Sequence, residues 1–408
     1  MTLNPALVQD LDSNLESLVE LYKEFHQIPE LSMQEHATAQ KITSIVQSYG
    51  YDAFSCGTTG VVATLKNGDG PVIAYRADTD GLPIQEDTGV DFASTARGTL
   101  PDGTQVPVMH GCGHDTHISV GLETARLLAE HRDLWSGTVV FLFQPGEETS
   151  EGAAGMLADG LWDRAPKPSA IFGQHVWPAV AGTVNVSVGT AMAMANCLEV
   201  TVHGKQAHGS QPENSIDPVV LGAFMVTRLQ TVVSREISAR EAVVLTIATF
   251  HAGLKENIIP DRAVFTINLR TFDEEARAKA MGAIERIIRA EAAGAGAPEP
   301  EIRQMFEFPR CYNDPDLTTD LIGSLRAELG EDSVIESAAV TGSEDVGRFG
   351  DEIGVPYVYW FFGGHTKEAL EAGASGNHSP MFLPDDVSTA LRTGVRAALT
   401  ALVGHLQK

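Results

Sequence analysis

The segment His110–His117 constrains the fold of this chain more than any other part of it. It reads His-Gly-Cys-Gly-His-Asp-Thr-His, so four potential metal ligands and two glycines lie within eight residues, directly before a stretch with helical periodicity. Cys112 and His114 are one residue apart, and the glycines give the loop the freedom to turn both side chains toward one ion. The simpler alternative is a Gly-rich turn with a buried thiol, and the context of the motif decides between the two.

Four other segments offer a carboxylate or an imidazole directly after an apolar run of β character. The residues in question are Asp78 and Asp80, Glu147 and Glu148, His175, and His378. In open α/β sheets, ligands bind outside the carboxyl ends of the strands, where loops that are distant in sequence meet. The sequence therefore predicts one site built from five loops.

Length and charge limit the class of protein. With 408 residues the chain exceeds the usual size of a single core, so we expect two domains. Its 28 basic and 54 acidic residues give a net charge of −26, which disfavours nucleic acid and anionic membranes as partners. No segment approaches the roughly 18 apolar residues of a membrane span. Four scattered cysteines without CxxC spacing and an N-terminus without a secretion signal predict a cytoplasmic location.

Alternating β and helical patterns predict an α/β fold with a mixed, centrally parallel sheet. Strands are expected at 61–65, 72–77, 138–143 and 170–174, and helices at 7–25, 34–49, 115–131 and 151–160. After a change of rhythm, a helix at 316–329, a strand at 357–362 and a helix at 384–406 resume this pattern. The sheet and its helices should form the domain that carries the metal site.

The order of elements changes near residue 197. Strand, helix, strand, strand, helix and strand follow one another at 198–203, 215–235, 243–250, 263–271, 274–293 and 301–306. This βαββαβ order is typical of ferredoxin-like domains. We therefore predict an inserted domain at 191–311, between catalytic parts at 1–190 and 312–408. The Ala/Gly/Pro-rich stretch 292–300 is expected to be a loop inside this insert.

The candidate ligands form a mixed set of sulfur, nitrogen and oxygen donors: Cys112, His114, Glu148, His175 and His378. Such a set suits Zn²⁺, although Mn²⁺, Co²⁺ and Ni²⁺ are also compatible with it. A thiolate can bridge two ions, so a dinuclear centre with a bridging water is expected. In an extended backbone, neighbouring side chains point opposite ways, so Glu148 can bind metal while Glu147 faces the substrate as a base.

The motifs resemble the aminoacylase branch of the zinc-dependent aminoacylase/carboxypeptidase superfamily, which includes N-acyl-amino-acid amidohydrolases, hippurate hydrolases and indoleacetyl-amino-acid hydrolases. The matching stretches follow in the right order over nearly the whole chain: 76–83, 109–117, 144–148, 174–176, 203–209, 257–261, 342–345 and 377–380. The resemblance implies a dinuclear catalytic domain with a ferredoxin-like lid. Because such lids often mediate dimerisation, a homodimer through the insert is an open possibility.

The resemblance also assigns roles residue by residue in the catalytic part. The five candidate ligands match the metal ligands of the family, and Glu147 matches its general base. Asp78 and Asp80 are expected to contact the ligand residues and hold them in place, without binding metal themselves.

In the insert, His208 matches a residue that reaches the substrate or the developing oxyanion. Asn257 and Arg270 belong to the same lid, and we assign them to the substrate carboxylate or the oxyanion. Ser343 is expected either to cap a helix or to shape the rim of the pocket.

The implied function is a metal-dependent amidohydrolase that cleaves an N-acyl amino acid into a carboxylic acid and a free amino acid. Glu147 would assist the attack of a metal-bound water. A dipeptidase or an N-carbamoyl-amino-acid hydrolase is the alternative on the same site. A cysteine hydrolase with Cys112 as nucleophile would keep its activity after chelation. A non-catalytic binding protein is disfavoured by the intact Glu147. The apolar stretch 358–362 is either an acyl pocket or a buried strand.

Overall fold

The chain divides into two compact units in the computed structural model, which describes residues 2–406. Unit 1 contains the chain up to Ala191, the segment Tyr312–Ala339, and the chain from Asp345 onward. Unit 2 contains Met192–Cys311 and Val340–Glu344. Within the described part of the chain, no helix is both long enough and apolar enough to cross a membrane.

Unit 1 is built on a mixed sheet with the strand order β1-β2-β6-β3-β7-β18-β8-β17. The strands are β1 (Asp52–Cys56), β2 (Gly60–Asn67), β3 (Val72–Asp78), β6 (Gly137–Gln144), β7 (Ala170–Val180), β8 (Val184–Val186), β17 (Val334–Glu336) and β18 (Tyr357–His365). The four central strands β6, β3, β7 and β18 run parallel, which confirms the predicted centrally parallel sheet. Every residue of β6 is buried, as expected for a parallel strand with both faces covered.

Helices cover this sheet. They are α1 (Pro5–His26), α2 (His36–Ser48), α3 (His114–Glu130), α4 (Gly152–Ala158), α5 (Leu161–Arg164), α8 (Pro315–Leu329), α9 (Gly347–Ile353), α10 (Lys367–Glu371) and α11 (Val387–His405). Helices α3 and α11 pack on the central strands, and α1 packs on these two helices. Together these elements form the main hydrophobic core. Helix α11 begins three residues later than predicted, because the side chain of Asp386 accepts the amide of Thr389 and starts the helix there.

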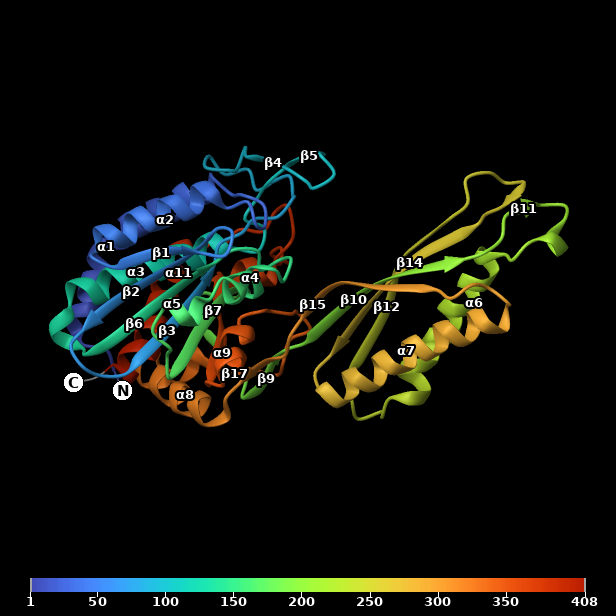
Figure 1. Cartoon of the computed structure of the whole chain (residues 1–408). Helices are drawn as coiled ribbons and strands as arrows, with labels where there is room; N and C mark the ends of the chain where they lie inside the picture. Colours follow the sequence, from blue (N-terminus) through green and yellow to red (C-terminus); the bar gives the residue numbers. More distant parts are fainter. Residues whose placement is uncertain (1, 407–408) are drawn as a thin grey trace. The chain divides into compact units, whose positions relative to one another are not determined.

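Unit 2 has the predicted βαββαβ order: β10 (Met194–His203), α6 (Pro218–Thr231), β12 (Val243–Ala252), β14 (Arg262–Thr271), α7 (Glu274–Gly294) and β15 (Glu301–Phe308). Its antiparallel sheet has the strand order β12-β14-β10-β15, and α6 and α7 lie on one face of it (Figure 1). Every second residue of β14, from Ala263 to Leu269, is buried in the core beneath these helices. The Ala/Gly/Pro-rich stretch is the loop between α7 and β15, as predicted.

Several short strands have no counterpart in the sequence-based prediction. These are the hairpin β4 (Arg97–Thr99) and β5 (Gln105–Pro107), the pair β9 (Gly189–Met192) and β16 (Cys311–Asn313), and the ribbon β11 (Ala207–His208) and β13 (Ile258–Ile259), besides β1, β8 and β17. Two to five residues are too few to show a clear alternation of apolar and polar side chains.

The helix-capping role predicted for Ser343 is wrong. The helix that follows it, α9, begins only at Gly347, and no side chain caps its first turn. The hydroxyl of Ser343 instead accepts a hydrogen bond from Nη1 of Arg270 at 3.2 Å.

Candidate metal centre

The loop before α3 is shaped by a glycine that no other residue could replace. Gly113 has φ = +86°, and a Cβ atom there would lie 2.4 Å from Cγ1 of Val176. Only glycine combines this backbone conformation with so close a neighbour. The helix therefore starts directly at His114, whose side chain is fully buried, and Cys112 lies just before it at 8% exposure.

Cys112 and His114 each belong to a compact group of potential ligand atoms. The atoms offered by Cys112, Glu148 and His378 lie within 4.8 Å of one another, and those of His114, Glu147 and Glu148 form a second such group. Glu148 belongs to both groups, so the two overlap as the two halves of a dinuclear centre would.

His175, on strand β7, and His378, in a loop, complete the cluster. Nε2 of His175, on β7, lies 3.4 Å from Sγ of Cys112. His378 has φ = +68°, and its amide donates to the carbonyl of Gly111 at 2.7 Å. Its Nε2 lies 3.1 Å from Oε1 of Glu148. All five residues predicted as ligands are thus linked by short contacts into one cluster.

Two of the imidazoles turn Nε2 toward the cluster. Nδ1 of His114 donates to the carbonyl of Asp80 at 2.9 Å, and its buried Nε2 has no hydrogen-bond partner. Nδ1 of His175 donates to the carbonyl of Val176 at 2.6 Å, which leaves its Nε2 facing Cys112 without a proton. An imidazole that is anchored through one nitrogen and bare at the other is the usual form of a metal ligand.

The other two histidines of the 110–117 segment lie outside this set. His117 accepts the amide of Val176 on Nε2 at 2.8 Å, so its Nδ1 carries the proton and donates to Asp78. Both nitrogens of His117 are therefore engaged, although it lies beside His114 and His175. His110 is buried without a hydrogen-bond partner, and burial lowers its pKa to about 4, so it is neutral.

Asp78 sits in a buried network that the sequence analysis did not assign. Its Oδ2 accepts Nη1 of Arg76 at 2.6 Å, and Nε of Arg76 donates to Gln144 at 2.8 Å. Nε2 of Gln144 donates to Asp345 at 2.6 Å. The available signal was a charged Arg76 inside the apolar strand β3, because a buried charge requires a partner. The network places Asp78 beside His117 and His114.

Asp80 supports the cluster from the other side. Its Oδ1 lies 3.1 Å from Nδ1 of His114, and its Oδ2 accepts the hydroxyl of Ser32 at 2.7 Å and the amide of Glu148 at 3.1 Å. Ser32 was missed because a lone serine in a loop carries no signal in the sequence.

Glu147 and Glu148 do not lie in the extended backbone that was predicted for them. Both residues lie in a turn, closed by the amide of Ser150 donating to the carbonyl of Glu147 at 2.8 Å, and not in an extended segment. The turn brings both carboxylates to the same side, next to His114. Oε2 of Glu147 lies 3.9 Å from Nε2 of His114.

The cluster carries an excess of negative charge that suits a cation. Burial, together with the charges of Glu148 and Glu147, raises the pKa of the Cys112 thiol well above its usual value. Burial opposes protonation of His114, yet Asp78 and Asp80 raise its pKa to about 10. A divalent ion would compensate these carboxylates and allow the thiolate to form. The donor set therefore fits a metal centre.

The residues predicted in the insert lie in unit 2. His208 is exposed, and its Nδ1 accepts the amide and the hydroxyl of Ser210 at 3.1 and 2.8 Å. The carbonyl of Asn257 accepts the amide of Gly209 at 2.8 Å, so Asn257 and His208 belong to one small ribbon. Nη1 of Arg270 donates to the carbonyl of Thr341 at 2.7 Å.

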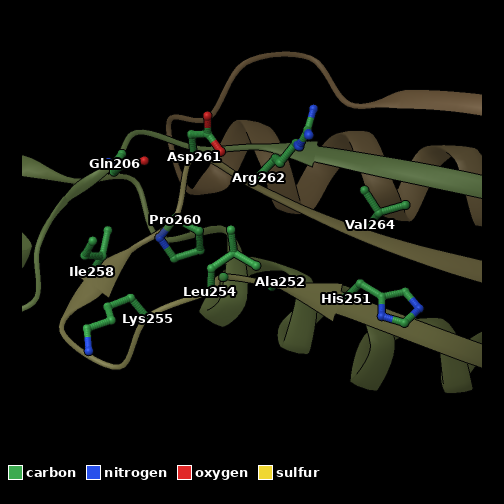
Figure 2. A pocket seen from close by; sticks show the side chains of 11 residues that line it. Gln206, His251, Ala252, Leu254, Lys255, Ile258, Pro260, Asp261, Arg262 and Val264 are labelled. Carbon is green, nitrogen blue, oxygen red and sulfur yellow. The ribbon is translucent and has the colours of Figure 1, made fainter.

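A hollow of about 450 Å³ also opens on unit 2, between β12, β14 and the loop that joins β12 to β13 (Figure 2). Lys255 points away from Asp261 and Arg262 (Figure 2). These polar groups do not converge on a common ligand, as they do in a functional site. The chemistry of the chain therefore centres on the cluster in unit 1.

Comparisons with known proteins agree with this centre. A model of the peptidase family M20/M25/M40 matches residues 74–400. N-acetylcysteine deacetylase of Bacillus subtilis is 35% identical over 390 residues, covering 95% of this chain and 96% of the relative. N-acyl-L-amino acid amidohydrolase of Geobacillus stearothermophilus is 37% identical over 279 residues, covering 67% and 72%.

A solved structure gives the same answer. A dinuclear metal-binding peptidase of the M20 family from Bacillus subtilis has a TM-score of 0.77 to this chain at 31% identity, covering 96% and 99% of the two chains. These findings confirm the resemblance inferred from the motifs and the class of reaction. The chain belongs to the peptidase family M20/M25/M40, and it is a metal-dependent amidohydrolase.

Proposed function

We propose that this amidohydrolase cleaves N-acyl amino acids into a carboxylic acid and a free amino acid. In this proposal the segments 1–190 and 312–408 form the catalytic domain and 191–311 the lid. The names of two relatives, a deacetylase and an N-acyl-L-amino acid amidohydrolase, support the substrate class. The single observation that carries the proposal is the buried carboxylate of Glu147 at the metal cluster, 3.9 Å from His114.

The residues of the chain divide the work. Cys112, His114, Glu148, His175 and His378 would hold two ions, and those ions, when bound, polarise the amide carbonyl and make water more acidic. Glu147 accepts the proton of the attacking water and returns it to the departing amine. Asp78 and Asp80 hold the imidazoles in place. His208 donates a hydrogen bond to the carbonyl oxygen or to the substrate carboxylate, and Asn257 and Arg270 contact the substrate carboxylate or the oxyanion.

We propose Zn²⁺ as the native metal, with Mn²⁺, Co²⁺ and Ni²⁺ as alternatives. The thiol among the ligands supports Zn²⁺, because soft sulfur donors favour it over harder ions. Metal analysis of protein purified without added metal should find close to two ions per chain. One ion or none after reconstitution would contradict the dinuclear proposal.

The substrate class is tested by the release of amino acids from a panel. The panel contains acetyl, benzoyl, long-chain and indoleacetyl amino acids, together with dipeptides and N-carbamoyl amino acids. We expect kcat/KM to be highest for an N-acyl amino acid, to fall to background after chelation, and to return when metal is added. A clear preference for dipeptides or carbamoyl compounds would replace the proposed substrate class. Activity that survives complete metal removal would refute the metal mechanism.

We also propose a homodimer through unit 2. Strand β12 forms one edge of the sheet, so the outer side of its backbone has no partner strand in the described chain. Next to it, Val220 and Phe224 of α6 are 52% and 63% exposed, and the ring of Phe250 lies against Gly222. An open strand edge beside exposed apolar side chains suits a second copy of the chain.

Sedimentation velocity tests the dimer. The protein should sediment as a dimer at micromolar concentration, and Phe224→Lys should convert it to a monomer, whereas Arg289→Lys on α7 should not. A wild-type monomer at tens of micromolar would contradict the proposal.

We further propose a cytoplasmic location. The four cysteines are buried and form no disulfide within residues 2–406, as expected for a protein kept in a reducing compartment. Cell fractionation tests it, and recovery of the protein from the medium or from an oxidising compartment would contradict it.

A further inference from the structure

The carboxylate of Glu35 is buried directly before helix α2 but does not cap that helix. Glu35 is 0% exposed and directly precedes α2, a position where a side-chain oxygen usually accepts one of the first helical amides. The amides of Ala37 and Thr38 donate to Glu30 instead, at 3.1 and 2.9 Å. Capping of α2 therefore does not explain Glu35.

Glu35 instead holds the loop that carries the two glutamates of the site. Its Oε1 accepts the amide of Gly146 at 2.8 Å and that of Met33 at 2.9 Å, and its Oε2 accepts the hydroxyl of Thr59 at 2.5 Å. Gly146 directly precedes Glu147. All three donors are neutral, and burial together with the charge of Asp80 raises the pKa of Glu35 to about 7, so the chain keeps an ionisable group in its interior where a neutral acceptor would cost less. A role in the site would account for that cost.

A second contact from the same segment fixes the other side of Glu147. The hydroxyl of Ser32 donates to Oδ2 of Asp80, and this same oxygen accepts the amide of Glu148. The amide of Gly146, before Glu147, thus donates to Glu35. The amide of Glu148, after Glu147, donates to Asp80, which in turn accepts the hydroxyl of Ser32. Residues 32–35 therefore hold the main chain on both sides of Glu147. The segment 32–35 and the loop at Gly146 are in close contact, because a Cβ atom on Gly146 would lie 2.5 Å from Sδ of Met33.

We propose that Glu35 is a positioning residue for Glu147. By accepting the Gly146 amide it sets the direction in which the Glu147 carboxylate leaves the turn. The inference rests on the proposed role of Glu147 as the base. A catalytic group displaced by about 1 Å can lose about 10²-fold in rate while the binding of substrate and metal is retained.

The test compares loss of the whole Glu35 carboxylate with loss of one of its hydrogen bonds. Glu35→Ala should lower kcat by about 10- to 100-fold, with KM within about twofold and full metal occupancy at saturating metal. Glu35→Gln retains an oxygen for Gly146 and should recover most of kcat. Thr59→Val removes only the bond to Oε2, so it should lower Tm but leave kcat within about threefold. Hydrogen exchange at the Gly146 amide should become faster in Glu35→Ala and stay slow in Thr59→Val.

Three results would overturn the proposal. They are an unchanged kcat in fully metal-loaded Glu35→Ala, an equal loss in Thr59→Val, and an unchanged exchange rate at Gly146. If Glu35→Ala does not fold, Glu35→Met, which fills the space without an acceptor, is measured in the same way.

A double mutant separates this inference from the proposed function. If Glu35 acts through Glu147, Glu35→Ala should cost no further activity in a Glu147→Gln background, whereas a full additional loss would overturn the inference. A Glu147→Gln variant with normal turnover would refute the proposed base. In that case faster exchange at Gly146 in Glu35→Ala would still support the structural link.

Discussion

At the scale of single residues, the histidines of the site are distinguished by the partner of each ring nitrogen. His114 and His175 each donate through Nδ1 to a main-chain oxygen and turn Nε2 toward the cluster, whereas His117 uses both nitrogens for contacts outside it. The sequence could not predict this difference, because the partners of His117 are Asp78 and the Val176 amide, which lie on strands β3 and β7. The motifs predicted which residues are candidate ligands, but the hydrogen-bond partners of these residues can be identified only from the three-dimensional structure.

The role of the thiol gives a prediction at this scale. Cys112→Ser should lower the number of bound ions per chain, because a hydroxyl is a far weaker donor than a thiolate toward the proposed Zn²⁺. Cys56→Ser is the matched control, since Cys56 is also buried and donates to the carbonyl of Met156, away from the cluster. Metal analysis of both folded variants is the measurement. An unchanged stoichiometry in Cys112→Ser would show that Cys112 is not a ligand.

At the scale of elements, a buried ion network joins the end of α1 to the start of α3. His26, the last residue of α1, donates through Nδ1 to Asp115 at 2.6 Å and through Nε2 to Glu86 at 3.0 Å. Asp115 follows the candidate ligand His114 in the first turn of α3. Helical periodicity predicted both helices, but a contact between residues 26 and 115 leaves no trace in periodicity.

This network predicts a dependence of stability on pH. Burial alone would lower the pKa of His26, but the hydrogen bonds to Asp115 and Glu86 outweigh burial and raise the pKa from 6.5 to about 9. Because the folded pKa lies above the unfolded one, the stabilisation is fully present below pH 6.5 and is lost as the pH rises through 9. The shift corresponds to roughly 3 kcal/mol.

Urea unfolding of the wild type and of His26→Gln at pH 6 and pH 9.5 checks this prediction. The wild type should be more stable at pH 6, and the difference between the two proteins should shrink by pH 9.5. A difference that does not change with pH would contradict a charged His26.

At the scale of the whole molecule, the candidate metal cluster lies in unit 1, while three residues assigned to the substrate lie in unit 2. The change of rhythm near residue 197 predicted the insert because its elements are long and regular. The segment Val340–Glu344 groups with unit 2, although it lies after the predicted end of the insert. Five residues that associate through tertiary contacts, such as that of Arg270 with Thr341, have no signature in sequence.

His208 gives the prediction at this scale. If it donates to the carbonyl oxygen, His208→Ala should keep both ions and lose about 10²-fold or more in kcat. If it binds only the substrate carboxylate, KM should rise while kcat stays nearly constant. His203→Ala is the control, since His203 lies in the same unit and its ring is hydrogen-bonded to Glu301. Steady-state kinetics with wild-type kcat and KM for His208→Ala would show that His208 takes no part in the reaction.

If Glu147 is the base of this metal-dependent amidohydrolase, a Glu147→Gln variant should lose turnover but keep its metal. The amide has nearly the same shape as the carboxylate but cannot accept a proton. Turnover of the best N-acyl amino acid substrate is measured together with the metal content of the same sample. We predict full metal occupancy and a kcat that is lower by about 10²- to 10⁴-fold. Near-normal turnover in a fully metal-loaded Glu147→Gln protein would show that Glu147 is not the base.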